Sequence, residues 1–176
     1  VNFNDNEFEI NGLFNDITED KIRVIFSVPE NRKYYFQNDK LISRSSQIIG
    51  KFPVVILTPA DHAITQGSPA ERRKLVDSVI AQASSTYLQV LLDYNKTIKQ
   101  RSVVLNRLRE TFSKNTYTEL EAWTEKLITS GKDLIHHRIK FINQFNKYVF
   151  DSYKKIVGEK ENPSIEYSFL NGCNEE

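Results

Sequence analysis

Several features that mark common classes of protein are absent from this sequence. Its 176 residues include one cysteine, Cys173, which excludes an intramolecular disulfide and most zinc sites and suits a reducing cytoplasm. Basic and acidic residues number 24 and 23, so no global field demands a nucleic-acid partner. No apolar run approaches the ~20 residues that cross a bilayer, and no signal peptide is visible, so we expect no membrane partner.

Motifs for nucleotide and metal chemistry are also missing. The chain has six glycines and contains neither a G-x-x-x-x-G-K-[ST] loop nor a G-x-G-x-x-G fingerprint. His136 and His137 are neighbours and do not share a helix face, and His62 has no second ligand near it in the sequence. We therefore predict no catalytic residue, no metal site and no cofactor held by this chain alone. The lack of methionine, with the start at Val1, favours a piece cut from a longer protein.

The first 58 residues have the pattern of β-strands. Ile22, Val24, Phe26 and Val28 alternate with Lys21, Arg23, Ile25 and Ser27, which is the period of a half-buried strand. Residues 34–37 and 40–43 flank Asn38-Asp39 and predict a hairpin. The apolar, β-branched run Val54-Val-Ile-Leu57 predicts a central strand buried on both faces. We expect an antiparallel β meander that feeds this strand.

From Pro69 onward the apolar period is helical. Two series with the alternating spacing of a coiled-coil seam predict two helices in an antiparallel hairpin, joined by a polar turn near residues 113–118. The first series is Tyr87, Leu91, Tyr94, Ile98, Leu105, Leu108 and Phe112, and the second is Leu120, Trp123, Leu127, Ser130, Leu134, His137 and Phe141. Ile165, Tyr167 and Phe169 alternate again, which predicts a strand that returns to the sheet. The fold class is thus α+β, with a helical hairpin inserted in a β region.

One position of the first seam, residue 101, holds an arginine. A guanidinium in a helix seam must be paired or must reach solvent. With a turn near residue 115, Arg101 faces the small residues 129–131, which leave room for a large cation. It either forms a structural ion pair, for which Asp133 is a candidate, or contacts a nucleic-acid backbone or a neighbouring lobe of a larger protein.

The segment Ile64 to Asp77 is the most informative part of the chain. Gly67 is free to take a positive φ, and Ser68, Pro69 and Glu71 form a strong helix start. Local physics does not explain the adjacent Arg72 and Arg73, because cations are disfavoured at the positive end of a helix dipole. We expect a group outside the helix to bind them: a carboxylate, a phosphate or another domain.

The stretch from Phe52 to Asp77, with its G-x-P-x-x-R-R pattern, resembles the central segment of the RecF family of bacterial DNA replication and repair proteins. Residues 87–105 continue the match in the same order. RecF proteins are ABC-type ATPases related to SMC proteins, and the resemblance implies a partial ATPase lobe at 1–82, a helical hairpin lobe at 83–158 and a returning strand at 159–176. The Walker A, signature and Walker B motifs are absent here, so the chain alone is expected to be inactive as an ATPase.

The resemblance also implies what the whole protein does. RecF-like proteins bind ATP and Mg, dimerise on ATP, bind DNA at gaps or at single-strand to double-strand junctions, and support recombinase loading with mediator proteins. They act in bacterial cytoplasm in DNA replication, recombination, repair and the SOS response. The matched family motif consists of Gly67, Pro69, Arg72, Arg73, Asp77, Lys99, Gln100 and Arg101. Gln66-Gly67 is similar to the Q-loop of SMC proteins, and Asp61 is an alternative residue that couples the lobes.

The first hairpin helix is locally basic, although the whole chain is nearly neutral. Its DNA-contact candidates are Lys96, Lys99, Arg101, Arg107 and Arg109. Such a surface follows phosphates with an affinity that depends strongly on salt. The alternative is an ordinary solvated helix face on a hairpin that binds mediator proteins as a scaffold without direct DNA contact. A third alternative is a self-contained α+β interaction protein that carries the motif by accident.

Overall fold

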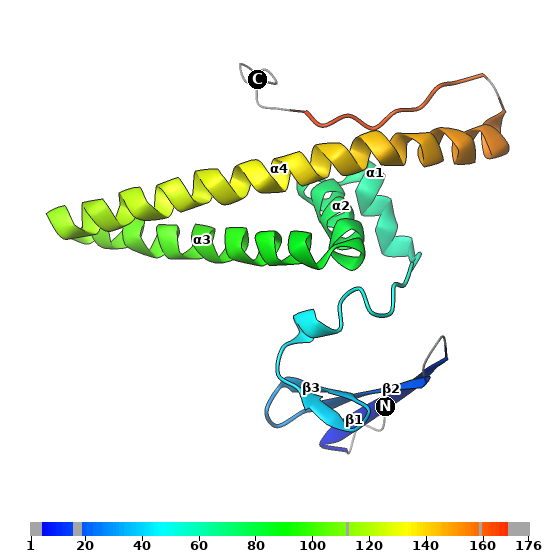
Figure 1. Cartoon of the computed structure of the whole chain (residues 1–176), viewed down its shortest axis with the longest axis horizontal. Coiled ribbons are helices and arrows are strands. Elements are labelled where there is room, and N and C mark those ends of the chain that lie inside the picture. Colours follow the sequence, from blue (N-terminus) through cyan, green and yellow to red (C-terminus); the bar gives the residue numbers. More distant parts are fainter. Residues whose placement is uncertain (1–4, 16–18, 112, 159, 169–176) are drawn as a thin grey trace. The chain divides into compact units, whose positions relative to one another are not determined.

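We describe the fold from a computed structural model, which describes residues 5–15, 19–111, 113–158 and 160–168. The chain divides into two compact units, residues 1–52 and 53–176, and each is described by itself. The first is a sheet and the second is helical, so the α+β class is confirmed (Figure 1). Phe112, Phe169 and Cys173, which entered the sequence analysis, lie outside the described residues.

The first unit is a four-stranded antiparallel meander in the order β1-β2-β3-β4. The strands are β1 (Glu7–Asn15), β2 (Glu19–Ser27), β3 (Arg32–Gln37) and β4 (Lys40–Ile42). The predicted hairpin at Asn38-Asp39 is present, and both turn residues have positive φ, as a tight two-residue hairpin requires. Side chains of Gln37 and Asn38 both donate hydrogen bonds to Asp20, which fixes this turn against β2.

The predicted central strand at Val54–Leu57 is wrong. Residues 53–58 form no strand, and Val55 is 97% exposed. A strand buried on both faces needs paired neighbours and covering layers, and the described residues supply neither to this run. Its one described hydrogen bond joins the Val54 N–H to the side chain of Gln82 at 2.9 Å.

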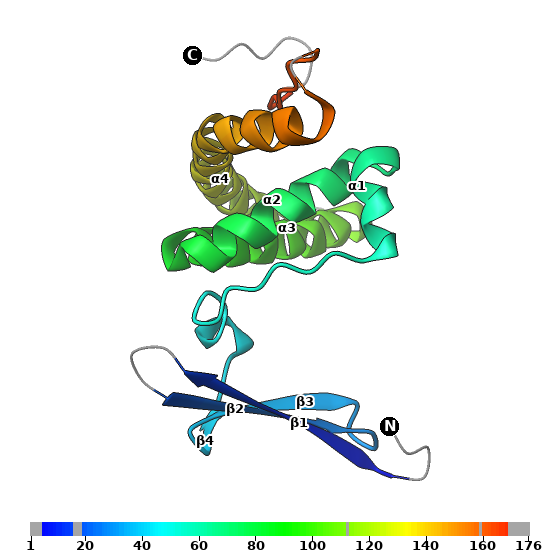
Figure 2. The ribbon, with the colours of Figure 1, turned by 90° about the vertical axis from the view of Figure 1, so that its right-hand side faces the viewer.

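The second unit begins with two short helical turns, η2 (Pro59–His62) and α1 (Ala63–Gln66). Three longer helices follow: α2 (Pro69–Ala83), α3 (Ser85–Glu110) and α4 (Lys114–Val157). Helices α3 and α4 lie side by side as the predicted hairpin, and α2 packs on both near the start of α3 (Figures 1 and 2). The core is formed by Ile80, Ala81, Tyr87, Leu88 and Leu134, where the three helices meet.

The hairpin register differs from the prediction because the turn is shorter than expected. Helix α3 ends at Glu110 and α4 begins at Lys114, so α4 starts before Thr118 rather than after it. The ring of Tyr94 therefore lies against Gly131, and Arg101 donates a hydrogen bond to Thr124. Seven residues forward along α3 thus correspond to seven residues backward along α4, as antiparallel helices require. The buried face of α3 is also shifted by one residue: Thr97 and Val104 are buried, whereas the predicted Ile98 is exposed.

The segment after α4 does not form the predicted strand in residues 161–168. The side chain of Asn146 instead accepts from the N–H of Ile165 at 2.7 Å and donates to its carbonyl at 2.9 Å. These bonds occupy the backbone groups that a neighbouring strand would have used. The lobe boundaries at 82 and 158 are not tested by this arrangement and stay predictions.

Candidate nucleic-acid interface and its supporting ion pair

The family-motif residue Asp77 lies at the centre of the helical unit. Arg138 of α4 binds it with two parallel bonds, Nε to Oδ1 and Nη2 to Oδ2, each 2.8 Å long. The hydroxyl of Tyr87 on α3 donates to the same Oδ1 at 2.5 Å. One carboxylate therefore ties α2 to both helices of the hairpin. Arg138 is 9% exposed and Tyr87 is fully buried, so the group is a buried charge network.

Burial and hydrogen bonding shift the pKa values of Arg138 and Tyr87, the two partners of Asp77. Burial by itself lowers the pKa of Arg138, but its hydrogen bonds with Asp77 and Tyr167 outweigh this effect and raise the pKa. Burial and the hydrogen bond to Asp77 raise the pKa of the Tyr87 hydroxyl. Arg138 therefore stays cationic and Tyr87 stays a neutral donor at physiological pH. Arg138 was not among the predicted site residues, although Arg101 was predicted because it is a cation at a seam position.

Gly67 is required for a different reason from the one expected. Its φ is −84°, so it does not use the left-handed region. A Cβ atom at this position would lie 2.4 Å from the carbonyl oxygen of Ala63, where no atom fits. The side chain of Ser68 makes no capping hydrogen bond, although Pro69 is the first residue of α2 as predicted. The turn thus depends on close backbone approach and on proline.

Arg72 has partners outside α2, as expected, but they are backbone carbonyls of the preceding turn rather than a carboxylate, a phosphate or another domain. Its Nη1 donates to the carbonyls of Gly67 at 3.2 Å and Ile64 at 3.4 Å. These carbonyls belong to the end of α1, where free acceptors and the negative end of the dipole favour a cation. The guanidinium therefore joins α1 to α2.

Arg73 is exposed, and within the described residues it has no hydrogen bond or ion pair. It lines a cavity of about 410 Å³ where the start of α2 meets α4 and the segment after it. The other polar side chains of this cavity are Arg72, Arg138, Glu166, Tyr167 and Ser168. The role of Arg73 stays a prediction.

Asp61 and Gln66, the two residues proposed to couple the lobes, precede α2 in the sequence. Asp61 accepts hydrogen bonds from the N–H and hydroxyl of Thr58 at 2.5 and 3.1 Å, which caps the turn η2. Gln66 is the last residue of α1 and is exposed. Neither placement tests a Q-loop role, which also stays a prediction.

The five DNA-contact candidates on α3 differ in their availability. Lys96, Lys99 and Arg109 are exposed, as is the motif residue Gln100. Arg101 donates from Nε to the hydroxyl of Thr124 at 2.9 Å, so neither residues 129–131 nor Asp133 is its partner. Arg107 forms an ion pair with Glu119 at 3.1 Å. The lysines are thus the cations of α3 that are most available to phosphates.

Helix α4 adds two residues to this surface that the sequence analysis did not select. Trp123 lies one turn after Glu119, and the ammonium of Lys126 sits 5.6 Å from the centre of its ring. Lys126 is exposed and Trp123 is half-buried. An aromatic ring next to the cation of Lys126, one helical turn from the partner of Arg107, is a combination that suits nucleic acid. We call Lys96, Lys99, Arg107, Trp123 and Lys126 the basic hairpin face.

Other chemistry is not indicated in the part of the chain that the structure describes. No group of three or more histidine, cysteine, aspartate or glutamate side chains there could hold a metal ion. The ring of His137 packs edge-on against Tyr87 at 5.5 Å, which gives it a packing role. None of the described helices is long and apolar enough to cross a membrane.

Comparison with known proteins identifies the family. The chain is 34% identical over 164 residues to the DNA replication and repair protein RecF of Salinibacter ruber, which covers 93% of the chain and 40% of that protein. It is 34% identical over 178 residues to RecF of Chloroherpeton thalassium, which covers 99% of the chain and 47% of that protein. The chain belongs to the RecF family. It spans less than half the length of these RecF relatives, and no protein-family model matches it.

Solved structures of RecF share the fold. The chain superposes on a structure of the recombination mediator protein RecF-ATP in the RecFOR pathway with a TM-score of 0.81 at 29% identity. A second structure, RecF-ATPrS, gives a TM-score of 0.79 at the same identity. Each match covers 91% of the chain and 43% of the solved chain. The predicted combination of β meander and helical hairpin is therefore a RecF-type arrangement.

Proposed function

We propose that this chain is part of a DNA replication and repair protein that binds DNA at gaps or single-strand to double-strand junctions. In the whole protein, ATP and Mg drive dimerisation, and mediator proteins help to load the recombinase in the bacterial cytoplasm. The observation that carries this proposal is the RecF fold, kept over 91% of the chain at 29% identity. We expect the chain alone to hydrolyse no ATP, because its sequence has no Walker A motif.

Within this function, we assign DNA contact to the basic hairpin face. Lys96 and Lys99 are three residues apart on a helix, so they project from adjacent positions of one side. Both are exposed, and no ion pair among the described residues holds either of them. When such cations neutralise phosphates, the counterions condensed on the DNA are released, so the affinity falls as the salt concentration rises. Arg107 contributes less because Glu119 already neutralises it.

The test is the binding of gapped duplex DNA across a salt series. The Lys96→Ala/Lys99→Ala variant should lower the slope of log affinity against log salt by about 2, roughly one per phosphate contact removed. Lys132→Ala/Lys140→Ala removes two exposed lysines from α4 and serves as the matched control, with an unchanged slope expected. Trp123 is the only tryptophan in the sequence, so its fluorescence should change on DNA binding.

The second candidate function is a scaffold that binds mediator proteins without touching DNA. The engagement of Arg101 with Thr124 and of Arg107 with Glu119 favours it, because both cations satisfy structural partners. Equal salt slopes for the lysine variant and the parent chain would support the scaffold and reject DNA contact at this face.

A further inference from the structure

The outer side of α4 near the hairpin turn carries an apolar groove with acidic residues. Tyr117 and Ile128 are 49% and 68% exposed, so this side of α4 presents apolar surface to solvent. The groove between them has a volume of about 390 Å³ and is also lined by Glu121, Thr124 and Glu125. We call Tyr117, Glu121, Glu125 and Ile128 the acidic α4 face.

The two glutamates of this face have no partner of opposite charge among the residues that the structure describes. Neither has a lysine or arginine three or four positions away on α4. They are four residues apart and therefore repel each other along the helix. Both also lie beyond the first turn, where the dipole no longer stabilises an anion.

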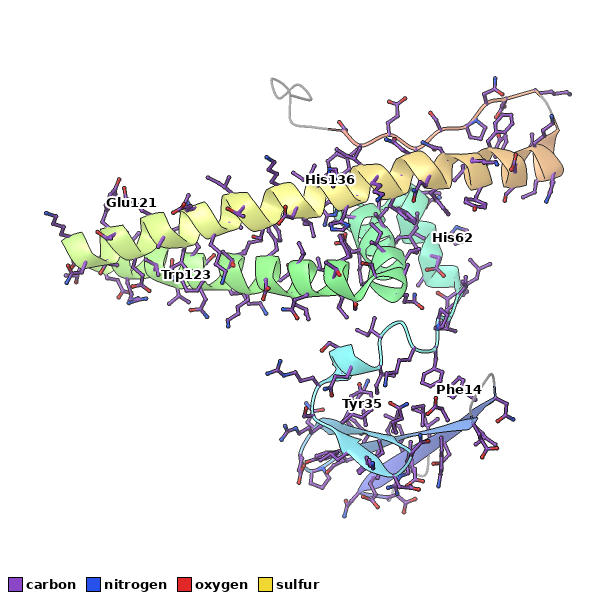
Figure 3. The ribbon with its side chains drawn as sticks, in the orientation of Figure 1. Phe14, Tyr35, His62, Glu121, Trp123 and His136 are labelled. Carbon is purple, nitrogen blue, oxygen red and sulfur yellow. The ribbon has the colours of Figure 1, made fainter. Side chains whose placement is uncertain are left out.

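The acidic α4 face is distinct from the basic hairpin face. With about 100° of rotation per residue, Tyr117, Glu121 and Ile128 fall on one side of α4, whereas Glu119, Trp123 and Lys126 fall on another. Figure 3 shows Glu121 and Trp123 on different sides of α4. Phosphates are repelled by the glutamates, so DNA is excluded from this side. Tyr117 and Ile128 together give this side an apolar surface that a protein partner can cover.

We propose that the acidic α4 face binds a basic amphipathic helix of a partner protein. This inference rests on the proposed function, since it assigns one side of the hairpin to DNA and the other to a protein. Tyr117 and Ile128 are eleven residues apart, so the occupant has two apolar anchors separated by about 16 Å along its axis. Lysine or arginine between these anchors pairs with Glu121 and Glu125.

The test uses a synthetic helical peptide with leucine anchors at this spacing and lysines between them, and measures its binding by fluorescence anisotropy. Glu121→Lys/Glu125→Lys and, separately, Ile128→Asp should each weaken binding by about tenfold or more. Asp133→Lys/Asp151→Lys makes the same change of total charge elsewhere on α4 and should leave binding nearly unchanged. The same peptide with glutamate in place of lysine should not bind.

Three outcomes would overturn the proposal: no binding of the lysine peptide, equal losses in the control variant, or binding of the glutamate peptide. A second copy of the chain is a competing occupant, because Leu92 and Val103 on α3 are exposed beside Lys96 and Lys99. Sedimentation showing self-association that Glu121→Lys/Glu125→Lys abolishes would assign the face to that copy instead. The salt slope for DNA should not fall in this variant, which separates failure here from failure of the DNA assignment.

Discussion

The helical unit and the sheet unit bury their apolar residues to very different extents. Of the eight buried apolar residues in the described chain, seven lie in the helical unit and only Ile22 lies in the sheet. The sheet instead has stacked rings, Phe8 on Phe26 and Phe14 on Phe52, at partly exposed positions. The helical unit thus contains its own core and charge network, whereas the meander is held mainly by backbone pairing and turns. Substitutions that remove buried groups should therefore matter most in the helices.

The largest effect should come from breaking the buried pair. Asp77→Ala leaves Arg138 buried without its carboxylate, which should destabilise the helical unit by about 3–5 kcal/mol. The free energy of unfolding is measured by denaturant titration followed by helical circular dichroism. Asp77→Leu/Arg138→Met removes both charges and should recover much of the loss. A loss below about 1 kcal/mol in Asp77→Ala would show that the pair is not integral to the unit.

A smaller effect is expected at Gly67. The Cβ atom of Gly67→Ala meets the carbonyl of Ala63 at 2.4 Å, so the turn between α1 and α2 must shift, at a cost of about 1–3 kcal/mol. Gly131→Ala is the matched comparison, since its Cβ lies 3.3 Å from the movable ring of Tyr94 and alanine favours helix. Thermal unfolding should rank Gly67→Ala well below Gly131→Ala. The reverse ranking would contradict the role assigned to Gly67.

The smallest effect should appear in the sheet on acidification. Hydrogen bonds from Gln37 and Asn38 lower the pKa of Asp20 below its ordinary value of 3.8. A lowered pKa means that the stabilisation is present above pH 3.8 and is lost as the pH falls through the lower folded value. The amide protection factors at the Asn38-Asp39 turn, measured relative to the intrinsic exchange rate at each pH, should therefore fall as the pH drops below 3.8. In Asp20→Asn this acid-dependent loss of protection should disappear, and its persistence would assign the effect to another carboxylate.

Periodicity predicted the elements of both units but not the side of each helix that is buried. The alternation from Ile22 to Val28 and the two seams are present as β2, α3 and α4. Tyr87 is buried as predicted, but α2 also packs on the start of α3 and buries Leu88, and farther along α3 the buried residues are Thr97 and Val104, each one residue before a predicted position. Sequence spacing within one helix carries no information about a third helix.

The functional residues show the same limit. Asp77 was selected by its motif, but its partner Arg138 lies 61 residues away, and no local pattern joins them. A partner of Arg72 outside its helix was expected, but not its kind, because the carbonyl of Ile64 comes within reach only through the turn at Gly67. The exposure of Val54–Leu57 differs from the prediction because neighbouring strands are a property of the sheet and not of the run itself.

The unequal lengths of the hairpin helices have a mechanical consequence. Helix α4 has 44 residues and α3 has 26, and Arg138 anchors α4 to α2 well behind the hairpin turn. The helix from Lys114 to Arg138 makes an arm of roughly 36 Å, so a tilt of about 10° at the anchor would displace its tip by roughly 6 Å. A small shift of Asp77 that tilts α4 at Arg138 would therefore move the tip of the arm by a larger distance.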